Sequence, residues 1–470
     1  MAGTSFEEFH QKRVNIDSWD FASDDIHTFN TAATFRNWND TETEWSLLSF
    51  FGRASYNFND RYLASASIRR DGSSRFGKDN RFGVFPAVSA AWRISEEAFF
   101  QDVPVINNLK LRVSWGQTGN DNIGNYSSFG GLTNSNYSYG GSLAFGFAPT
   151  GPDNPTLTWE TNTTTDFGLD MGFLGNRITI SADYYINNTE NLLLDVPAPA
   201  ISGFPGSVTL NSGSVRNKGI EFELASTNIR SSALGGLTWR TRFNMSHNSN
   251  EVTGLGGSVQ ELIGELRSVP THITTVGLPI GSFFLYESDG VLSEADMAND
   301  DVAKFNKQEA GNIKIVDQNG DKVINDADRT VVGSNHPSLI YGMTNSLKIG
   351  NFDFSVLLTG VTGFESYFMF GRYIDSGGTN RNQMTNWTNG YRSAAEPGDG
   401  QTPYPFGANP EFTDRWLYKG DYIRVKNLTF GYTLPAAVLD KLNMRSLRAY
   451  FSADNLFNST DFPGGNPESN

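Results

Sequence analysis

Residues 164–173 read TTDFGLDMGF, and apolar and polar side chains alternate strictly along this stretch. Phe167 and Met171 share one face of an extended chain, while Asp166 and Asp170 share the opposite face. A period of two residues predicts a half-buried β-strand, and a face with carboxylates predicts contact with water. Residues 178–187 repeat the pattern after a short turn. We therefore expect neighbouring antiparallel strands that carry one charged face.

The same alternation recurs along the chain and predicts about twelve strands. The expected strands span residues 45–58, 61–71, 84–94, 109–117, 159–173, 177–189, 217–228, 237–248, 339–349, 352–362, 422–434 and 447–457. Tight turns such as 59–60 and 350–351 alternate with long connections rich in Gly, Asn, Ser and Pro. Long connections occupy 118–158, 249–338 and 363–421. This alternation is typical of outer-membrane barrels, whose short turns face the periplasm and whose long loops face outside.

The composition agrees with strands that have lipid on one face and water on the other. The 470 residues include 48 Gly, and aromatic residues make up 13% of the chain, which favours strands over helices. Apolar residues reach only 38%, which suits strands that line a wet lumen. The net charge of −15 argues against a nucleic-acid partner. Because the chain has no cysteine, hydrogen-bonded sheet rather than disulfides must supply rigidity.

One expected strand breaks the alternation. Between residues 422 and 432 the polar face that carries Arg424 and Lys426 continues into Leu428 and Phe430. A β-bulge inserts one extra residue and moves the following side chains to the opposite face. A bulge near Asn427 would restore the alternation.

Six motifs in a fixed order resemble one family. They are residues 50–100 (beginning FFGRASYNFNDRYLASASIRRDGSSRFG), 109–126 (LKLRVSWGQTGNDNIGNY), 157–185 (LTWETNTTTDFGLDMGFLGNRITISADYY), 211–224 (NSGSVRNKGIEFEL), 420–435 (GDYIRVKNLTFGYTLP) and 449–457 (AYFSADNLF). Together they resemble the C-terminal half of SusC/RagA-type TonB-linked outer-membrane proteins. The resemblance begins near residue 45 and runs to the end.

The resemblance implies an all-β fold, namely an antiparallel transmembrane β-barrel of about 22 strands with long extracellular loops. It also implies an N-terminal plug moved by TonB, a SusD-like lipoprotein over the mouth, and import of oligosaccharides or peptides. The expected location is the outer membrane of a Gram-negative, Bacteroidetes-like cell, with no required cofactor. We expect residues 1–44 to be an incoming barrel segment or loop. Residues 45–470 would form a partial barrel without its plug or final strand.

One loop has the spacing of a calcium-binding segment. Oxygen ligands at positions 1, 3, 5, 7, 9 and 12 of such a loop can surround Ca²⁺. The matching residues are Asp317, Asn319, Asp321, Val323 (through its carbonyl), Asn325 and Asp328. Lys322 stands where a glycine is usual, and Asp328 replaces the usual glutamate. The alternative is a solvated turn in which Asn and Asp side chains cap their own backbone.

Aromatic residues in the long connections are candidates for contact with a substrate or with the lid protein. The set comprises Tyr126, Phe129, Tyr139, Tyr367, Trp387 and Tyr391. Aromatic side chains offer flat apolar faces, and those of Tyr and Trp have a polar edge as well, so they suit sugar rings or a protein surface. The alternative is that they pack within their own loops. Strand aromatics such as Trp92 and Trp239 are expected to form girdles at the membrane interfaces.

Charged residues on the polar strand faces are expected to line the lumen. They are Lys110, Arg112, Glu221, Glu223, Arg240 and Arg242. Glu221 and Glu223 share one face of one strand, whereas a glycosidase needs its two carboxyl groups on opposite sides of a substrate. The five histidines show no metal-ligand spacing, so no HExxH-type site is expected. The sequence also has no cysteine nucleophile, no Walker loop and no GxSxG motif, so we expect no enzyme activity. The rival hypothesis is a surface β-rich carbohydrate-binding protein without transport, with apolar faces packed in a sandwich.

Overall fold

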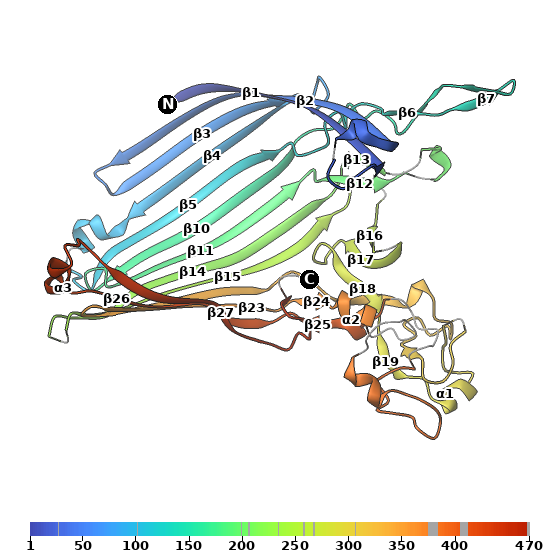
Figure 1. Ribbon diagram of the computed structural model, residues 1–470. Coiled ribbons are helices and arrows are strands. Elements are labelled where there is room, and N and C mark those ends of the chain that lie inside the picture. The colour runs from blue at the N-terminus through green and yellow to red at the C-terminus, as the bar shows by residue number, and fades with distance from the viewer. Residues whose placement is uncertain are drawn as a thin grey trace. The chain divides into compact units, whose positions relative to one another are not determined.

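The computed structural model describes residues 1–26, 28–100, 102–198, 200–204, 207–233, 235–256, 259–266, 268–305, 307–374, 384–404 and 412–467. The chain divides into two units. The first unit holds residues 1–90, 114–165 and 188–214, and the second holds 91–113, 166–187 and 215–470. Most of the described residues lie in strands, and no helix among them is long and apolar enough to span a membrane (Figure 1).

Thirteen strands form one sheet, and neighbours in the sheet follow the order of the chain. They are β1 (Ala2–Phe21), β2 (Ala32–Phe58), β3 (Tyr62–Ser73), β4 (Phe82–Arg93), β5 (Ile106–Asn120), β10 (Glu160–Phe173), β11 (Ile178–Glu190), β14 (Ser214–Ser231), β15 (Leu237–Gly254), β22 (Leu339–Ile349), β23 (Phe352–Thr362), β26 (Tyr422–Thr433) and β27 (Arg448–Thr460). The predicted all-β, antiparallel class is confirmed. Within the described chain β1 and β27 end the order, so the sheet is open. The strands form one sheet rather than the two facing sheets that the rival sandwich requires.

The first strand was missing from the sequence prediction. Residues 1–44, expected as an incoming barrel segment or loop but without an assigned strand, contain β1 and the start of β2. The two strands pair from Ala2 opposite Gly52 to Phe21 opposite Ala32. In β1 the run Phe6-Glu7-Glu8-Phe9 puts an acidic and an aromatic residue on each face, so no alternation marks the strand.

The predicted bulge in β26 is confirmed. Asn427 pairs with Leu357 and Val425 pairs with Leu358, so Lys426 is the extra residue. After the bulge the polar face continues through Asn427 and Thr429. Both side chains bond to Ser452 on β27.

The long connections carry secondary structure of their own, which the sequence analysis did not predict. In the second unit β16 (Glu261–Leu266), β17 (Val269–Thr275), β18 (Ser282–Tyr286) and β21 (Arg329–Gly333) form a four-stranded sheet. Two-stranded pairs are formed by β19 (Ser288–Val291) with β20 (Ile313–Ile315), and by β24 (Glu365–Tyr367) with β25 (Leu417–Lys419). The helices are α1 (Glu294–Ala298), α2 (Met369–Ile374) and α3 (Ala436–Lys441).

Connections in the first unit form short ribbons. They are β6 (Leu132–Asn134) with β9 (Phe147–Pro149), β7 (Tyr137–Tyr139) with β8 (Ser142–Ala144), and β12 (Leu193–Pro197) with β13 (Ser207–Asn211). Short 3-10 turns occur in both units of the described chain. They are η1 (Phe29–Thr31), η2 (Ile94–Glu96), η3 (Ala98–Phe100), η4 (Ala200–Ser202), η5 (Asp326–Asp328), η6 (Thr385–Asn389) and η7 (Asp414–Trp416).

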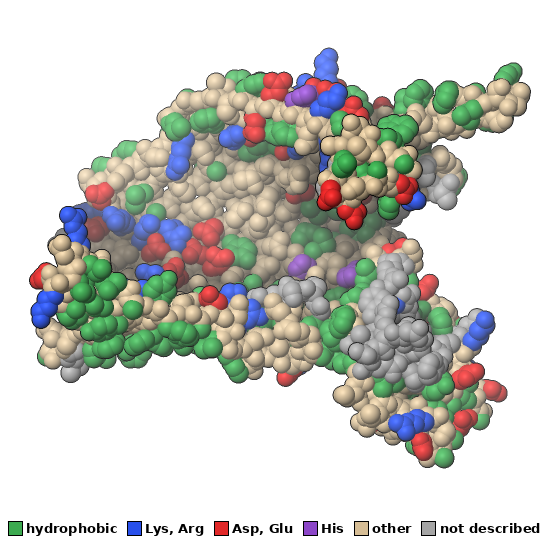
Figure 2. All heavy atoms as spheres, viewed as in Figure 1, with side chains coloured by type: hydrophobic (Ala, Val, Ile, Leu, Met, Phe, Trp, Pro, Cys, Tyr) green, Lys and Arg blue, Asp and Glu red, His purple; other side chains and the backbone are tan. Residues whose placement is uncertain are grey.

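Apolar cores lie mainly in the long connections rather than in the long strands. One cluster in the second unit includes Ile313, Ile315 and Trp416, and another includes Leu285 and Phe412. The long strands instead expose large apolar side chains. Phe352, Phe430, Tyr450 and Phe451 are 45%, 46%, 67% and 63% exposed. Figure 2 shows hydrophobic side chains gathered over the ends of β26 and β27 next to α3.

Candidate functional site

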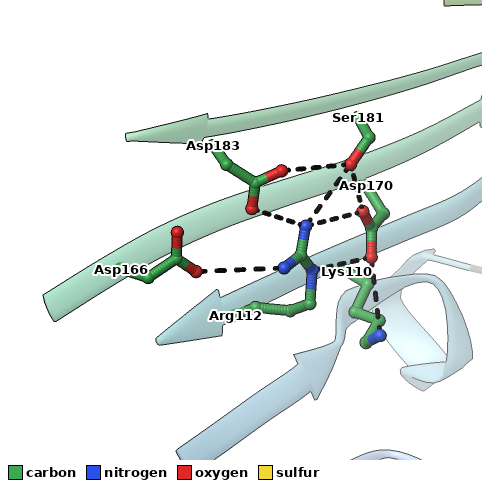
Figure 3. Close-up of polar contacts among 6 residues, drawn as sticks. All are labelled: Lys110, Arg112, Asp166, Asp170, Ser181 and Asp183. Carbon is green, nitrogen blue, oxygen red and sulfur yellow. Dashed lines mark hydrogen bonds and ion pairs between the residues drawn. The ribbon is translucent and has the colours of Figure 1, made fainter. Parts of the chain in front are cut away.

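A network of charged side chains joins three neighbouring strands of the second unit (Figure 3). Arg112 on β5 forms two hydrogen bonds with Asp170 on β10, with Nε–Oδ2 at 3.0 Å and Nη2–Oδ1 at 3.1 Å. The same Nη2 lies 2.8 Å from Oδ1 of Asp183 on β11. Lys110 Nζ lies 3.4 Å from Asp170 Oδ2, and Asp166 lies at the edge of the network. Three carboxylates therefore surround one guanidinium.

The strand period places these groups together. Lys110 and Arg112 are two residues apart on β5, and Asp166 and Asp170 are four apart on β10, so each pair shares a face. Gly168 lies between the two aspartates. A Cβ atom at Gly168 would lie 2.5 Å from Arg112 Cζ, so a glycine here leaves room for the guanidinium.

A hydroxyl completes the network. Ser181 Oγ on β11 donates to Asp170 Oδ1 at 2.9 Å and accepts a hydrogen bond from Arg112. The side chains of Arg112, Asp170 and Asp183 are only 29%, 26% and 22% exposed, so these ion pairs are better shielded than typical surface pairs. The network holds no activated nucleophile. Its fixed charges can orient a charged or polar solute.

Two hollows lie next to the charged network, and their linings extend to residues of β22 and β26. The first has a volume of about 310 Å³ and includes Asp183, Glu221 and Glu223 in its lining. The second has a volume of about 560 Å³ and includes Glu223, Arg242 and Lys426. We call the strand face that lines these hollows the hollowed face. Figure 2 shows acidic and basic side chains gathered in a depression over β10, β11 and β14.

The structure brings most of the predicted lumen residues together on the hollowed face or in the network. Lys110 and Arg112 belong to the network, and Glu221, Glu223 and Arg242 line the hollows. Arg240 lies opposite Ser346 and lines neither hollow. The sequence analysis placed Asp166 and Asp170 on a face in contact with water, but it did not identify them, Ser181 or Asp183 as partners of Arg112. Whether any of them lines a lumen stays a prediction.

The predicted calcium loop is a turn held by its own side chains. Asp317 accepts hydrogen bonds from the backbone N–H groups of Gly320 and Lys322 at 2.7 and 2.8 Å. Asp328 accepts from the N–H groups of Gln318 and Asn325 at 3.0 and 2.8 Å. Although the surrounding loop removes some water from Asp317, those N–H groups lower the pKa of its carboxyl. This geometry matches the capped-turn alternative, and calcium binding stays a prediction.

Other residues predicted to bind calcium also accept hydrogen bonds from backbone N–H groups within this turn. Asn319 Oδ1 accepts from the N–H of Asp321, and Asp321 Oδ1 accepts from the N–H of Val323, both at 2.8 Å. Asn325 Oδ1 accepts from the N–H of Ala327 at 2.9 Å.

The predicted contact aromatics differ in their exposure. Tyr126, Phe129 and Tyr139 are 49%, 62% and 77% exposed, so their rings are open to a ligand or partner. Tyr391 is buried and its hydroxyl donates to Glu294 at 3.3 Å, as expected for packing within a loop. Trp387 lies in η6 and is half-buried. Tyr367 lines an apolar cavity and lies 5.9 Å, between ring centroids, from Phe412.

One group of metal-capable side chains was not visible from sequence spacing. His10 Nε2 lies 2.8 Å from Glu42 Oε1 and 3.7 Å from Glu44 Oε1, across the β1–β2 pair. All three side chains are more than half exposed. Exposed groups of this kind commonly exist without an ion, so we assign no metal to them.

Comparison with known proteins identifies the family. A family model described as "TonB dependent receptor-like, beta-barrel" matches residues 3–456. This chain belongs to that family. The predicted resemblance to SusC/RagA-type proteins is confirmed.

Relatives and solved structures agree with this assignment. TonB-dependent receptor P3 of Formosa agariphila is 33% identical over 433 residues, which cover 91% of this chain and 42% of that protein. TonB-dependent receptor SusC of Bacteroides thetaiotaomicron is 30% identical over 450 residues, covering 92% of this chain and 42% of that protein. The structure of the RagAB peptide transporter superposes with a TM-score of 0.85 at 26% identity. That match covers 99% of this TonB-dependent receptor-like chain and 50% of the solved chain, so our chain spans about half of such proteins.

Proposed function

We propose that this chain is the C-terminal barrel portion of an outer-membrane nutrient importer of the SusC/RagA type. The whole protein would take up oligosaccharides or peptides with energy supplied through TonB. A SusD-like lipoprotein would cover the extracellular mouth. No catalytic step is needed, because the solute is bound, moved and released without any covalent change.

The contrast between the two faces of the strands carries this proposal. On β26 the side chain of Phe430 is 46% exposed and stacks on Phe352, with ring centroids 5.8 Å apart. Its neighbour Thr429 bonds to Ser452 on the opposite face. A strand with exposed aromatics on one side and hydrated polar groups on the other suits a wall between lipid and a water-filled lumen.

The long connections are the candidates for contact with the solute and the lipoprotein. Tyr126, Phe129 and Tyr139 offer exposed rings, and the second unit adds a loop sheet with its own core. Loops supported by a rigid scaffold commonly carry binding residues.

The test uses the full-length parent protein in its own cells. We expect it in the detergent-solubilised outer-membrane fraction, with a mobility on gels that changes on heating because the folded barrel resists detergent. Recovery from the soluble fraction would overturn the proposal. Deletion of the parent gene should then abolish growth on one class of oligosaccharide or peptide, and unchanged growth on both classes would contradict an import role.

A further inference from the structure

The second unit contains an apolar cavity beside the hollowed face. Its volume is about 580 Å³, within the range of roughly 300–1,000 Å³ typical of ligand pockets. The lining includes Phe283 and Leu285 from β18, Met369 from α2, and Phe412. Phe283, Leu285 and Phe412 are 5%, 0% and 1% exposed, so this wall is fixed by packing within the loop core.

Three polar side chains in the lining already have partners within the chain, namely Thr271, His272 and Glu365. His272 Nδ1 lies 2.9 Å from Thr271 Oγ1, and the His272 ring packs against Phe283 with centroids 5.1 Å apart. Burial lowers the pKa of His272, which favours the neutral imidazole. Glu365 Oε2 accepts a hydrogen bond from the N–H of Ser334 at 2.8 Å. A sugar placed here would lose water from many hydroxyls and find few replacement partners, which costs free energy.

The cavity adjoins charges of both signs. Ile340, Val361 and Tyr422 line both the cavity and the neighbouring hollow that contains Glu223, Arg242 and Lys426. Ile340 also lines the hollow that contains Asp183. A ligand with an apolar group in the cavity would therefore place its remaining atoms next to a carboxylate, a guanidinium and an ammonium group.

We propose that the cavity binds an apolar side chain of a short peptide while the peptide's charged and amide groups lie in the adjoining hollow. This inference rests on the proposed import function and selects peptides from its two substrate classes. A neutral oligosaccharide has no apolar side chain that could enter the cavity and no charge for Arg242 or Glu223. A peptide supplies both, because its side chain, its termini and its amides lie within a few bonds of one another.

The test compares three probes on the full-length protein in detergent, by isothermal titration calorimetry. They are Ala-Phe-Ala, Ala-Ser-Ala and the neutral sugar maltotriose. Ala-Phe-Ala should bind about tenfold or more tightly than Ala-Ser-Ala, because burial of a phenyl ring favours the complex. Maltotriose should not compete with Ala-Phe-Ala.

Three variants locate the site: a matched pair on one strand and a charge variant. Ile340→Trp should narrow the junction and remove the preference for Ala-Phe-Ala. Ser346→Trp lies on the same strand and face, six residues further on, and should keep the preference. Arg242→Gln should weaken both peptides by a similar factor, because it removes a charge that contacts the shared backbone. Heat-modifiable mobility verifies that each variant folds.

The outcomes separate the inference from the import function. Equal affinity for the two peptides, failure of either peptide to bind, or an Ile340→Trp variant that keeps its preference would overturn the peptide site. Competition by maltotriose that Ile340→Trp abolishes would also overturn it in favour of a glycan. In each case an outer-membrane location and gene-dependent growth would leave the import proposal standing.

Discussion

At the residue scale the charged network centres on Arg112, which three carboxylates and a serine surround. The alternation in the sequence predicted that Arg112 faces water with Lys110. It did not predict which acidic residues would meet it, because strand register depends on pairing between segments about 60 to 70 residues apart. The need for a glycine at position 168 could not be predicted from the sequence either, because it depends on the Arg112 guanidinium lying directly against Gly168.

Replacement of Arg112 should destabilise the sheet. Arg112→Leu leaves three carboxylates close together without their cation. We expect a loss of about 1–2 kcal/mol in the free energy of unfolding, because these pairs are only partly buried. Urea unfolding in lipid vesicles measures the loss. Arg240→Leu on β15 controls for the loss of one arginine outside the network, and an equal effect of both substitutions would contradict the network's special role.

Tyr286 should make the folded loop region less stable at alkaline pH. Its ring is 3% exposed, and burial raises the pKa of its hydroxyl to about 12. The unfolded tyrosine ionises near its ordinary value of about 10. The stabilisation from the neutral buried hydroxyl is therefore complete below about pH 10 and is lost as the pH rises toward 12. Near-UV circular dichroism between pH 9 and 12 should show a transition that weakens in Tyr286→Phe, and an identical transition in that variant would contradict this origin.

Limited proteolysis tests whether the loop 317–328 binds calcium. If the sequence prediction of calcium holds, Ca²⁺ should protect the loop from proteolysis, and both a chelator and Asp321→Ala should remove that protection. The hydrogen bonds that Asp317 and Asp328 accept from backbone N–H groups already close the turn. Protease resistance that is unchanged by calcium would therefore favour the self-capped turn.

At the element scale the sequence predicted twelve of the thirteen long strands and the bulge in β26. Strict alternation made them visible, because one apolar face and one polar face leave a clear signal. The sequence missed β1, whose two faces are mixed. It also missed the short loop strands: β24 and β25 have three residues each and pair across about 50 residues, so neither has a periodic signal of its own.

The bulge in β26 exists because the strand has one extra residue. Deletion of Lys426 would make Val425 and Asn427 neighbours and keep Leu428 and Phe430 on the apolar face. We therefore expect the deletion variant to form the heat-modifiable folded form. Lys426→Ala keeps the residue count and should also assemble normally. Loss of the folded form in the deletion variant alone would contradict this account of the register.

At the scale of the whole molecule the ordered motifs predicted the family, which the match over residues 3–456 confirms. Substrate class could not be read in the same way, because it depends on which loop residues meet in space. Leu285, Ile340 and Phe412 line one cavity although they come from three separate segments, and no sequence pattern connects them. The structure, by contrast, shows where the cavity and the charged hollow adjoin.

The central claim is that each long strand separates lipid from water. Positions 429 and 430 test it directly, because these neighbours lie on opposite faces of β26. These 470 residues contain no cysteine, so a single cysteine introduced at 429 or 430 can carry a spin label in the full-length protein reconstituted in lipid, once any cysteine elsewhere in that protein has been replaced. We predict that the label at 430 collides with oxygen dissolved in lipid and that the label at 429 collides with a water-soluble nickel chelate. Shielding of the label at 430 from both reagents, as in a dry core between two sheets, would contradict the account.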